Sequence, residues 1–126
     1  MSKRLPRNEI ESFNTDIWIK EVDFAITICD KDGIILEMND KSCKTFAKNG
    51  GSKLIGESIF SCHPPVAQEK IKKILDTHNP NVYTIEKEGQ KKLIYQTPWY
   101  DHGELRGLVE LSLVIPTEMP HYRRNS

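Results

Sequence analysis

The chain has 126 residues, enough for one domain with a single modest core. Hydrophobic residues make up 37% and charged residues 29%, a composition typical of a globular protein rather than a disordered or membrane-embedded one. Lys+Arg and Asp+Glu both total 18, and no apolar run approaches the ~20 residues of a membrane helix, so we expect neither nucleic acid nor a membrane as a partner.

An amphipathic helix is predicted in the N-terminal segment, residues 1–21. Ile10, Phe13 and Ile17 recur at three- and four-residue spacing among charged residues, which gives a narrow apolar stripe. Such a stripe has to cover another surface, either the sheet of its own chain or a second copy. We therefore predict that this segment caps the domain or holds a homodimer together.

A β-hairpin is predicted from Phe24 onward. Apolar residues alternate with smaller or polar ones up to Cys29, and the turn sequence Asp30-Lys31-Asp32-Gly33 then intervenes. A second β-rich run follows from Ile34 to Met38. Two such runs around an Asp-Gly turn are a strong hairpin signal.

Helices are predicted in the middle of the chain. Asn39-Asp40 offers a cap for one or two helical turns over residues 42–47, which Asn49-Gly50-Gly51 ends. A longer helix begins at Pro65, with apolar residues along one side and charged residues along the other. Asn79-Pro80 closes it.

Three strands are predicted in the last third, over Val82–Lys87, Lys91–Tyr100 and Leu105–Ile115. Pro98 has no N–H for a ladder hydrogen bond, so it predicts an edge or a bulge at that point of its strand. The polar residues 117–126 are expected to form a flexible tail. The element order favours an α+β fold with an antiparallel sheet.

Three short segments resemble the PAS superfamily of sensor domains, and together they place a PAS-like domain over residues 22–116. They are Asp30–Ile35 leading to Met38-Asn39, Leu54-Ile55-Gly56, and Asp101–Val109. The Cys62-His63-Pro64-Pro65 motif is similar to one subgroup of bacterial and archaeal PAS domains. The resemblance implies a five-stranded antiparallel sheet with short helices on one face and a pocket between them. It also implies that Asn39 caps a helix. Domains of this family bind haem, flavin or small metabolites, or bind nothing and mediate dimers.

The Cys62-His63 pair is the densest reactive chemistry in the chain. A nucleophile and its base usually meet across a fold, so adjacent residues are poor candidates for a catalytic pair. Two interpretations remain open: His63 hydrogen-bonds the loop backbone beside a buried Cys62, or both face a ligand. For a ligand pocket between sheet and helices we predict these residues: His63, Cys62, Phe46, Phe60, Ile71, Leu75, Tyr83, Tyr95 and Trp99.

No cofactor follows directly from the sequence. Covalent haem is excluded because no Cys-x-x-Cys-His motif is present, whereas non-covalent haem would need His63 or His78 as its axial ligand. The cysteine run of photoactive flavin sites in this superfamily is absent. The cysteines and histidines show no zinc spacing. Three cysteines without regular spacing argue against a disulfide framework and predict a reducing cytoplasm.

We therefore predict a stand-alone, non-enzymatic PAS-type sensory module that binds a small apolar ligand or cofactor. Its signal would pass through dimer contacts or to an output protein on a separate chain. The alternative is a ligand-free dimerisation domain, and a small Cys/His enzyme is a distant third. The sequence does not identify the ligand.

Overall fold

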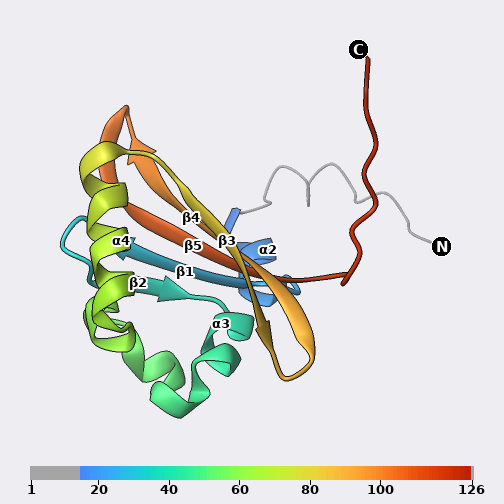
Figure 1. Ribbon diagram of the computed structural model, residues 1–126. Helices are drawn as coiled ribbons and strands as arrows, with labels where there is room; N and C mark the ends of the chain where they lie inside the picture. The colour runs from blue at the N-terminus through green and yellow to red at the C-terminus, as the bar shows by residue number, and fades with distance from the viewer. Residues whose placement is uncertain (1–14, 126) are drawn as a thin grey trace, which may run out of the picture.

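The computed structural model describes residues 15–125 and contains one five-stranded antiparallel sheet (Figure 1). Its strands lie in the order β2-β1-β5-β4-β3. Their bounds are β1 Ala25–Asp30, β2 Ile35–Met38, β3 Asn81–Lys87, β4 Gln90–Asp101 and β5 Glu104–Ile115. The two strands from opposite ends of the domain, β1 and β5, pair at the centre, which confirms the predicted antiparallel α+β fold.

A helical cap, defined here as residues 40–77, connects β2 to β3 and lies on one side of the sheet (Figure 1). Its elements are α3 Asp40–Thr45, η1 Ala47–Asn49, η2 Gly51–Leu54, η3 Ile59–Cys62 and α4 Pro65–Thr77. The short helix α2, Thr15–Glu21, precedes β1. The first part of the predicted N-terminal helix, including Ile10 and Phe13, lies outside the described residues.

The predicted β1–β2 hairpin is confirmed, and the side chain of Asp30 shapes its turn. Asp30 Oδ1 accepts hydrogen bonds from the backbone N–H groups of Asp32 and Ile34, at 2.9 and 3.0 Å. Gly33 has φ +82°, a conformation that glycine adopts without steric cost. The local turn chemistry therefore fixes the register of the first two strands.

Asn39 is the N-cap of α3, as predicted. Its Oδ1 accepts from the N–H of Ser42 at 3.0 Å and from the N–H of Ile26 in β1 at 2.9 Å. Its Nδ2 donates to the carbonyls of Ile19 and Phe24. One buried amide thus ties α3, β1 and the segment around α2 together, and all its hydrogen-bonding groups are used.

Helix α4 begins at Pro65 and ends at Thr77, and its C-cap His78 has a left-handed backbone (φ 63°) that closes the last turn before Asn79-Pro80. Its apolar side enters the core at Ile71 and Ile74. The core lies between the cap and the sheet, and its buried members are Cys29, Ile35, Met38, Leu54, Ile59, Ile71, Ile74 and Leu108.

The strand predictions for β3, β4 and β5 are correct to within one residue at each end. Pro98 lies beyond the stretch of β4 that pairs with β3, where its missing N–H costs no ladder bond on that side. A register irregularity follows directly, between Trp99 and Tyr100. At Pro98, β4 is therefore unpaired on the β3 side, as the predicted edge requires, and the irregularity lies one residue further on.

Within residues 15–125, no helix is both long and apolar enough to cross a membrane.

Candidate functional site

A row of polar side chains crosses the cap side of the sheet. The register pairs Thr27 of β1 with Glu110 of β5, Glu110 with Gln96 of β4, and Gln96 with Asn81 of β3. Residues directly opposite one another in antiparallel strands point to the same face. Polar groups from four strands therefore lie in one line beneath the helices.

Hydrogen bonds connect this row. Asn81 Nδ2 donates to Gln96 Oε1 at 2.9 Å, and Gln96 Nε2 donates to Glu110 Oε2 at 2.7 Å. At the other end, the hydroxyls of Thr27 and Ser42 share a hydrogen bond of 2.5 Å. Gln96 is 2% exposed and Glu110 7%, so these bonds replace the water that burial removes.

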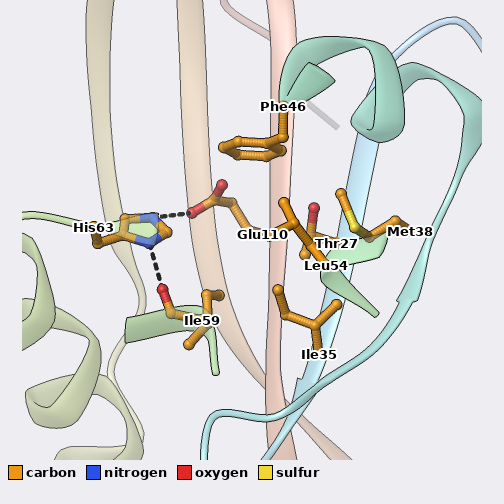
Figure 2. Close-up of a pocket in the computed structure, with 8 residues that line it drawn as sticks. All are labelled: Thr27, Ile35, Met38, Phe46, Leu54, Ile59, His63 and Glu110. Carbon is orange, nitrogen blue, oxygen red and sulfur yellow. Dashed lines mark hydrogen bonds and ion pairs between the residues drawn. The ribbon is translucent and has the colours of Figure 1, made fainter. Parts of the chain in front are cut away.

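His63 brings the cap onto this row (Figure 2). Its Nδ1 lies 2.8 Å from the carbonyl oxygen of Ile59, and its Nε2 lies 3.7 Å from Glu110 Oε2. The neighbouring Glu110 carboxylate raises the pKa of His63 above its usual 6.5, the Ile59 carbonyl adds to this, and partial burial opposes it. Only 14% of the His63 side chain is exposed, so its charge is poorly screened by water.

The loop around His63 is held by its own side chains. Ser58 caps η3 by accepting from the N–H of Phe60. Gln68, in the first turns of α4, donates from Nε2 to the carbonyls of Phe60 and His63, at 2.7 and 2.9 Å. The Pro64-Pro65 pair then starts α4 without needing the missing N–H groups. The imidazole is thereby fixed relative to both η3 and α4.

A small cavity lies beside His63 and Glu110, between the cap and the sheet (Figure 2). Its volume is about 10 Å³, close to the smallest space that holds one water molecule. Its lining residues are Thr27, Ile35, Met38, Phe46, Leu54, Ile59, His63 and Glu110.

A larger groove of about 220 Å³ adjoins this cavity and shares Phe46, His63 and Glu110 with it. It lies between the start of the cap and the inner face of the β3–β4 hairpin. Burial, with a contribution from the Glu110 charge, raises the pKa of Tyr83 in its wall. The full lining is Thr45, Phe46, Asn49, His63, Tyr83, Ile85, Lys87, Lys92, Ile94, Glu110 and Ser112.

The residues predicted to line a pocket fall into four groups. His63 and Phe46 line both spaces, and Tyr83 lines the groove. The next three, Phe60, Ile71 and Leu75, belong to or pack against the core cluster. The side chain of Cys62 lies outside what the structure describes.

The remaining two predicted residues, Tyr95 and Trp99, point to the opposite face of the sheet. They alternate along β4 with Gln96 and Pro98, and Gln96 points toward the cap. The Trp99 indole N–H donates to the Cys29 carbonyl at 3.0 Å, across the central strands. The structure therefore does not bring Tyr95 or Trp99 to the cavity or the groove.

The sequence analysis did not select Glu110, Gln96 or Thr27 for the site. Each is a polar residue on the inner face of a strand whose neighbouring positions are largely apolar or buried. That interruption of the pattern is a usable signal, because a buried polar group in a strand needs a partner. The partners themselves follow only from the register.

The site geometry does not fit haem. One ring nitrogen of His63 bonds Ile59 and the other faces Glu110, and the small cavity of about 10 Å³ beside them is far smaller than a porphyrin. His78, the other predicted axial ligand, is exposed beside Tyr100. Among residues 15–125, no group of three or more His, Cys, Asp or Glu is arranged to hold a metal ion.

The Cys29 thiol is buried and poorly suited to act as a nucleophile. Cys29 and Cys43 are free, and burial raises the pKa of Cys29 to about 11. A thiol with so high a pKa is almost entirely protonated at neutral pH and is a poor nucleophile.

Compared by sequence, the chain matches no family model and no curated protein. Compared by structure, it is similar to the PAS domain of an HTR-like protein from Haloarcula marismortui, with a TM-score of 0.59 and 19% identity over 86% of this chain and 95% of that one. It is also similar to the Aer2 receptor from Vibrio cholerae, a dual PAS-haem oxygen sensor, with a TM-score of 0.56 and 16% identity over 74% of this chain and 95% of that one.

A third similar structure is the PAS domain of BvgS from Bordetella pertussis, with a TM-score of 0.54 and 22% identity over 87% of this chain and 88% of that one. These matches cover most of both chains at low identity, so the likeness is one of backbone arrangement. The five-stranded sheet with its helical cap on one face therefore has the PAS fold.

Proposed function

We propose that the protein is a sensory module that binds a small ligand in the groove beside His63. The observation that carries this proposal is the His63–Glu110 contact, which joins the cap to the central strand β5 at the point where cavity and groove meet. A ligand in the groove contacts the cap through Phe46 and the sheet through Ile85 and Ile94. A ligand in the groove therefore touches both the cap and the sheet, the two parts that the His63–Glu110 contact joins.

Signalling by this arrangement needs only a difference in affinity. A ligand that prefers one placement of the cap shifts the population toward that placement, by as much as its affinity differs between the two. The structural likeness to PAS domains of sensor proteins supports this role. We propose that the signal passes through a homodimer or to an output protein on another chain.

The test is native mass spectrometry of the protein purified from its own host. We expect a retained small molecule in the wild type and its loss in Ile85→Trp, which fills the groove. Thr84→Trp is the matched control, because Thr84 alternates with Ile85 on β3 and points to the other face. A clean apo mass for the wild type would contradict the proposal.

A second candidate function is a ligand-free interaction domain. The volumes of the cavity, about 10 Å³, and of the groove, about 220 Å³, favour it, because ligand pockets commonly measure roughly 300–1,000 Å³. On this alternative the His63–Glu110 contact only stabilises the fold. The same mass spectrum separates the two candidate functions, because a ligand-free interaction domain is expected to give the mass of a dimer without a bound small molecule.

Several further predictions stay proposals. We propose a binding role rather than a catalytic one, because both His63 nitrogens are engaged and Cys29 is buried. The unpaired thiols Cys29 and Cys43 support a reducing, cytoplasmic location. We also propose membership of the PAS subgroup that the Cys62-His63-Pro64-Pro65 motif resembles.

A further inference from the structure

Four lysines surround the mouth of the groove. A neighbouring hollow of about 230 Å³ shares Thr45, Lys87 and Lys92 with the groove. Its lining adds Lys44 and Lys48 from the start of the helical cap. Lysines from two separate elements, the cap and the β3–β4 hairpin, thus line one space.

Positive charge exceeds negative charge among the residues that line this hollow. Among the ion pairs formed within residues 15–125, none includes any of the four lysines. A single carboxylate, that of Glu88, lines the same hollow. The chain as a whole carries no net charge, so this excess of positive charge is a local property of the mouth.

The interior of the groove has a different character. Its walls include Phe46, Tyr83, Ile85 and Ile94, so an apolar body would be removed from water there. At its inner end lies the Glu110 carboxylate, whose Oε2 accepts from Gln96 and faces His63. His63 already faces Glu110 at that end, so the inner end offers a carboxylate less positive charge than the four lysines of the mouth do.

These features set both the class and the orientation of an occupant. We propose that the groove binds a small organic acid, with its carboxylate at the lysines of the mouth and its apolar body inward over Ile85 and Ile94. This inference rests on the proposed function and adds the ligand class to it. Lys87 and Lys92 are the main recognition residues, since they line both the mouth and the groove.

The experiment compares octanoate with octanamide, which has the same apolar body without the charge. Binding to the full chain is followed by NMR through the methyl signals of Ile85 and Ile94. We expect octanoate to bind about five- to tenfold more tightly, the size expected from two partly exposed ion pairs. Raising the salt from about 0.05 to about 0.5 M should weaken octanoate binding and leave octanamide binding nearly unchanged.

The variant that tests the recognition residues is Lys87→Gln/Lys92→Gln. In this variant we expect octanoate and octanamide to bind with about equal affinity. Lys31→Gln is the matched control, because Lys31 lies in the β1–β2 turn at the other end of the sheet. Thermal melting of each variant checks that the fold is kept.

The outcomes distinguish this inference from the proposed function. Equal binding of acid and amide, shifting the groove methyls, would overturn the organic-acid inference and leave a ligand groove in place. Binding of neither probe would also overturn it, while the retained-ligand mass spectrum decides the proposed function by itself. A preference that survives in Lys87→Gln/Lys92→Gln would show that these lysines are not the recognition residues.

Discussion

At the scale of single residues, the cap meets the polar row of the sheet at the His63–Glu110 contact, which is an ion pair when His63 is protonated. Glu110 is nearly buried, and a buried carboxylate is costly unless hydrogen bonds and an opposite charge compensate it. Gln96 supplies the hydrogen bond and His63 faces the same oxygen. The protonation state of His63 therefore affects how firmly the cap is attached to the sheet.

The first prediction concerns pH. The pKa of His63 is raised in the folded state, so the folded protein binds more protons than the unfolded one between the two pKa values. The stabilisation is complete below about pH 6.5, the ordinary pKa, and is lost as the pH rises through the folded value. Urea unfolding across this window should show a falling free energy of unfolding.

His63→Gln is the comparison for that measurement, since it removes the titrating group and keeps a hydrogen-bonding side chain. We expect its free energy of unfolding to change less over the same pH window. Parallel curves for the wild type and His63→Gln would assign the pH dependence to other groups.

A second prediction concerns Gln96. Gln96→Ala leaves Glu110 without its donor and Asn81 without its acceptor, and it opens a space in a fully buried position. We expect a loss of about 2–4 kcal/mol in the free energy of unfolding. Thr97→Ala, the next residue on β4 and on the other face, should cost clearly less. Equal losses in both variants would show that the hydrogen bonds of Gln96 add nothing to the free energy of unfolding.

The sequence could identify some of these residues and not others. His63 is visible from sequence because it lies in a proline-bounded turn with reactive neighbours. Its partner Glu110 is 47 positions away in the chain, and the packing of the cap against the sheet brings the two together. Tyr95 and Trp99 were placed in the pocket because alternation defines two faces and does not say which one the helices cover.

At the scale of elements, local chemistry predicts most of the boundaries. The Asp30–Gly33 turn, the Asn39 cap and the Pro65 start each act through hydrogen bonds or backbone angles within a few residues. Such signals can be read from a single sequence. The long-range bonds of Asn39 to Ile26, Ile19 and Phe24 could not be read in that way.

Asn39→Ala provides the third prediction. It removes the cap of α3 and leaves the N–H of Ile26 and two carbonyls without their partners. We expect a loss of about 2–4 kcal/mol in the free energy of unfolding, above the roughly 1 kcal/mol of a simple helix cap. Asn79→Ala, in the exposed segment after α4, is the control and should change stability little. A cost near 1 kcal/mol for Asn39→Ala would mean that only the cap matters.

At the scale of the whole molecule, antiparallel pairing and mid-chain helices suffice to predict the fold class. The strand order, which places β1 beside β5, is not contained in any local pattern. The resemblance to PAS domains implied five antiparallel strands with helices on one face, which the structure has, and it did not specify the strand order. The size of the cavity was beyond sequence reasoning, because it depends on how closely Phe46, Leu54 and Ile59 pack.

The fourth prediction concerns assembly. Ile17 and Trp18 of α2 are 61% and 44% exposed, although both are large apolar residues. If the N-terminal segment holds a homodimer, Ile17→Asp and Trp18→Asp should lower the mass measured by light scattering, because a buried charge at an interface is costly. Glu21→Gln is the control. A dimer that survives both aspartate substitutions would place the interface elsewhere.

The most direct test of the central claim is hydrogen–deuterium exchange of wild type and Glu110→Gln. This change removes the charge that faces His63 and keeps an acceptor for Gln96. The account predicts faster exchange in residues 59–77, which contain η3 and α4, with the paired strands β4 and β5 unchanged and Glu104→Gln behaving as wild type. Unchanged exchange in residues 59–77, or an equal loss of protection across the sheet, would contradict the claim that this contact fastens the cap.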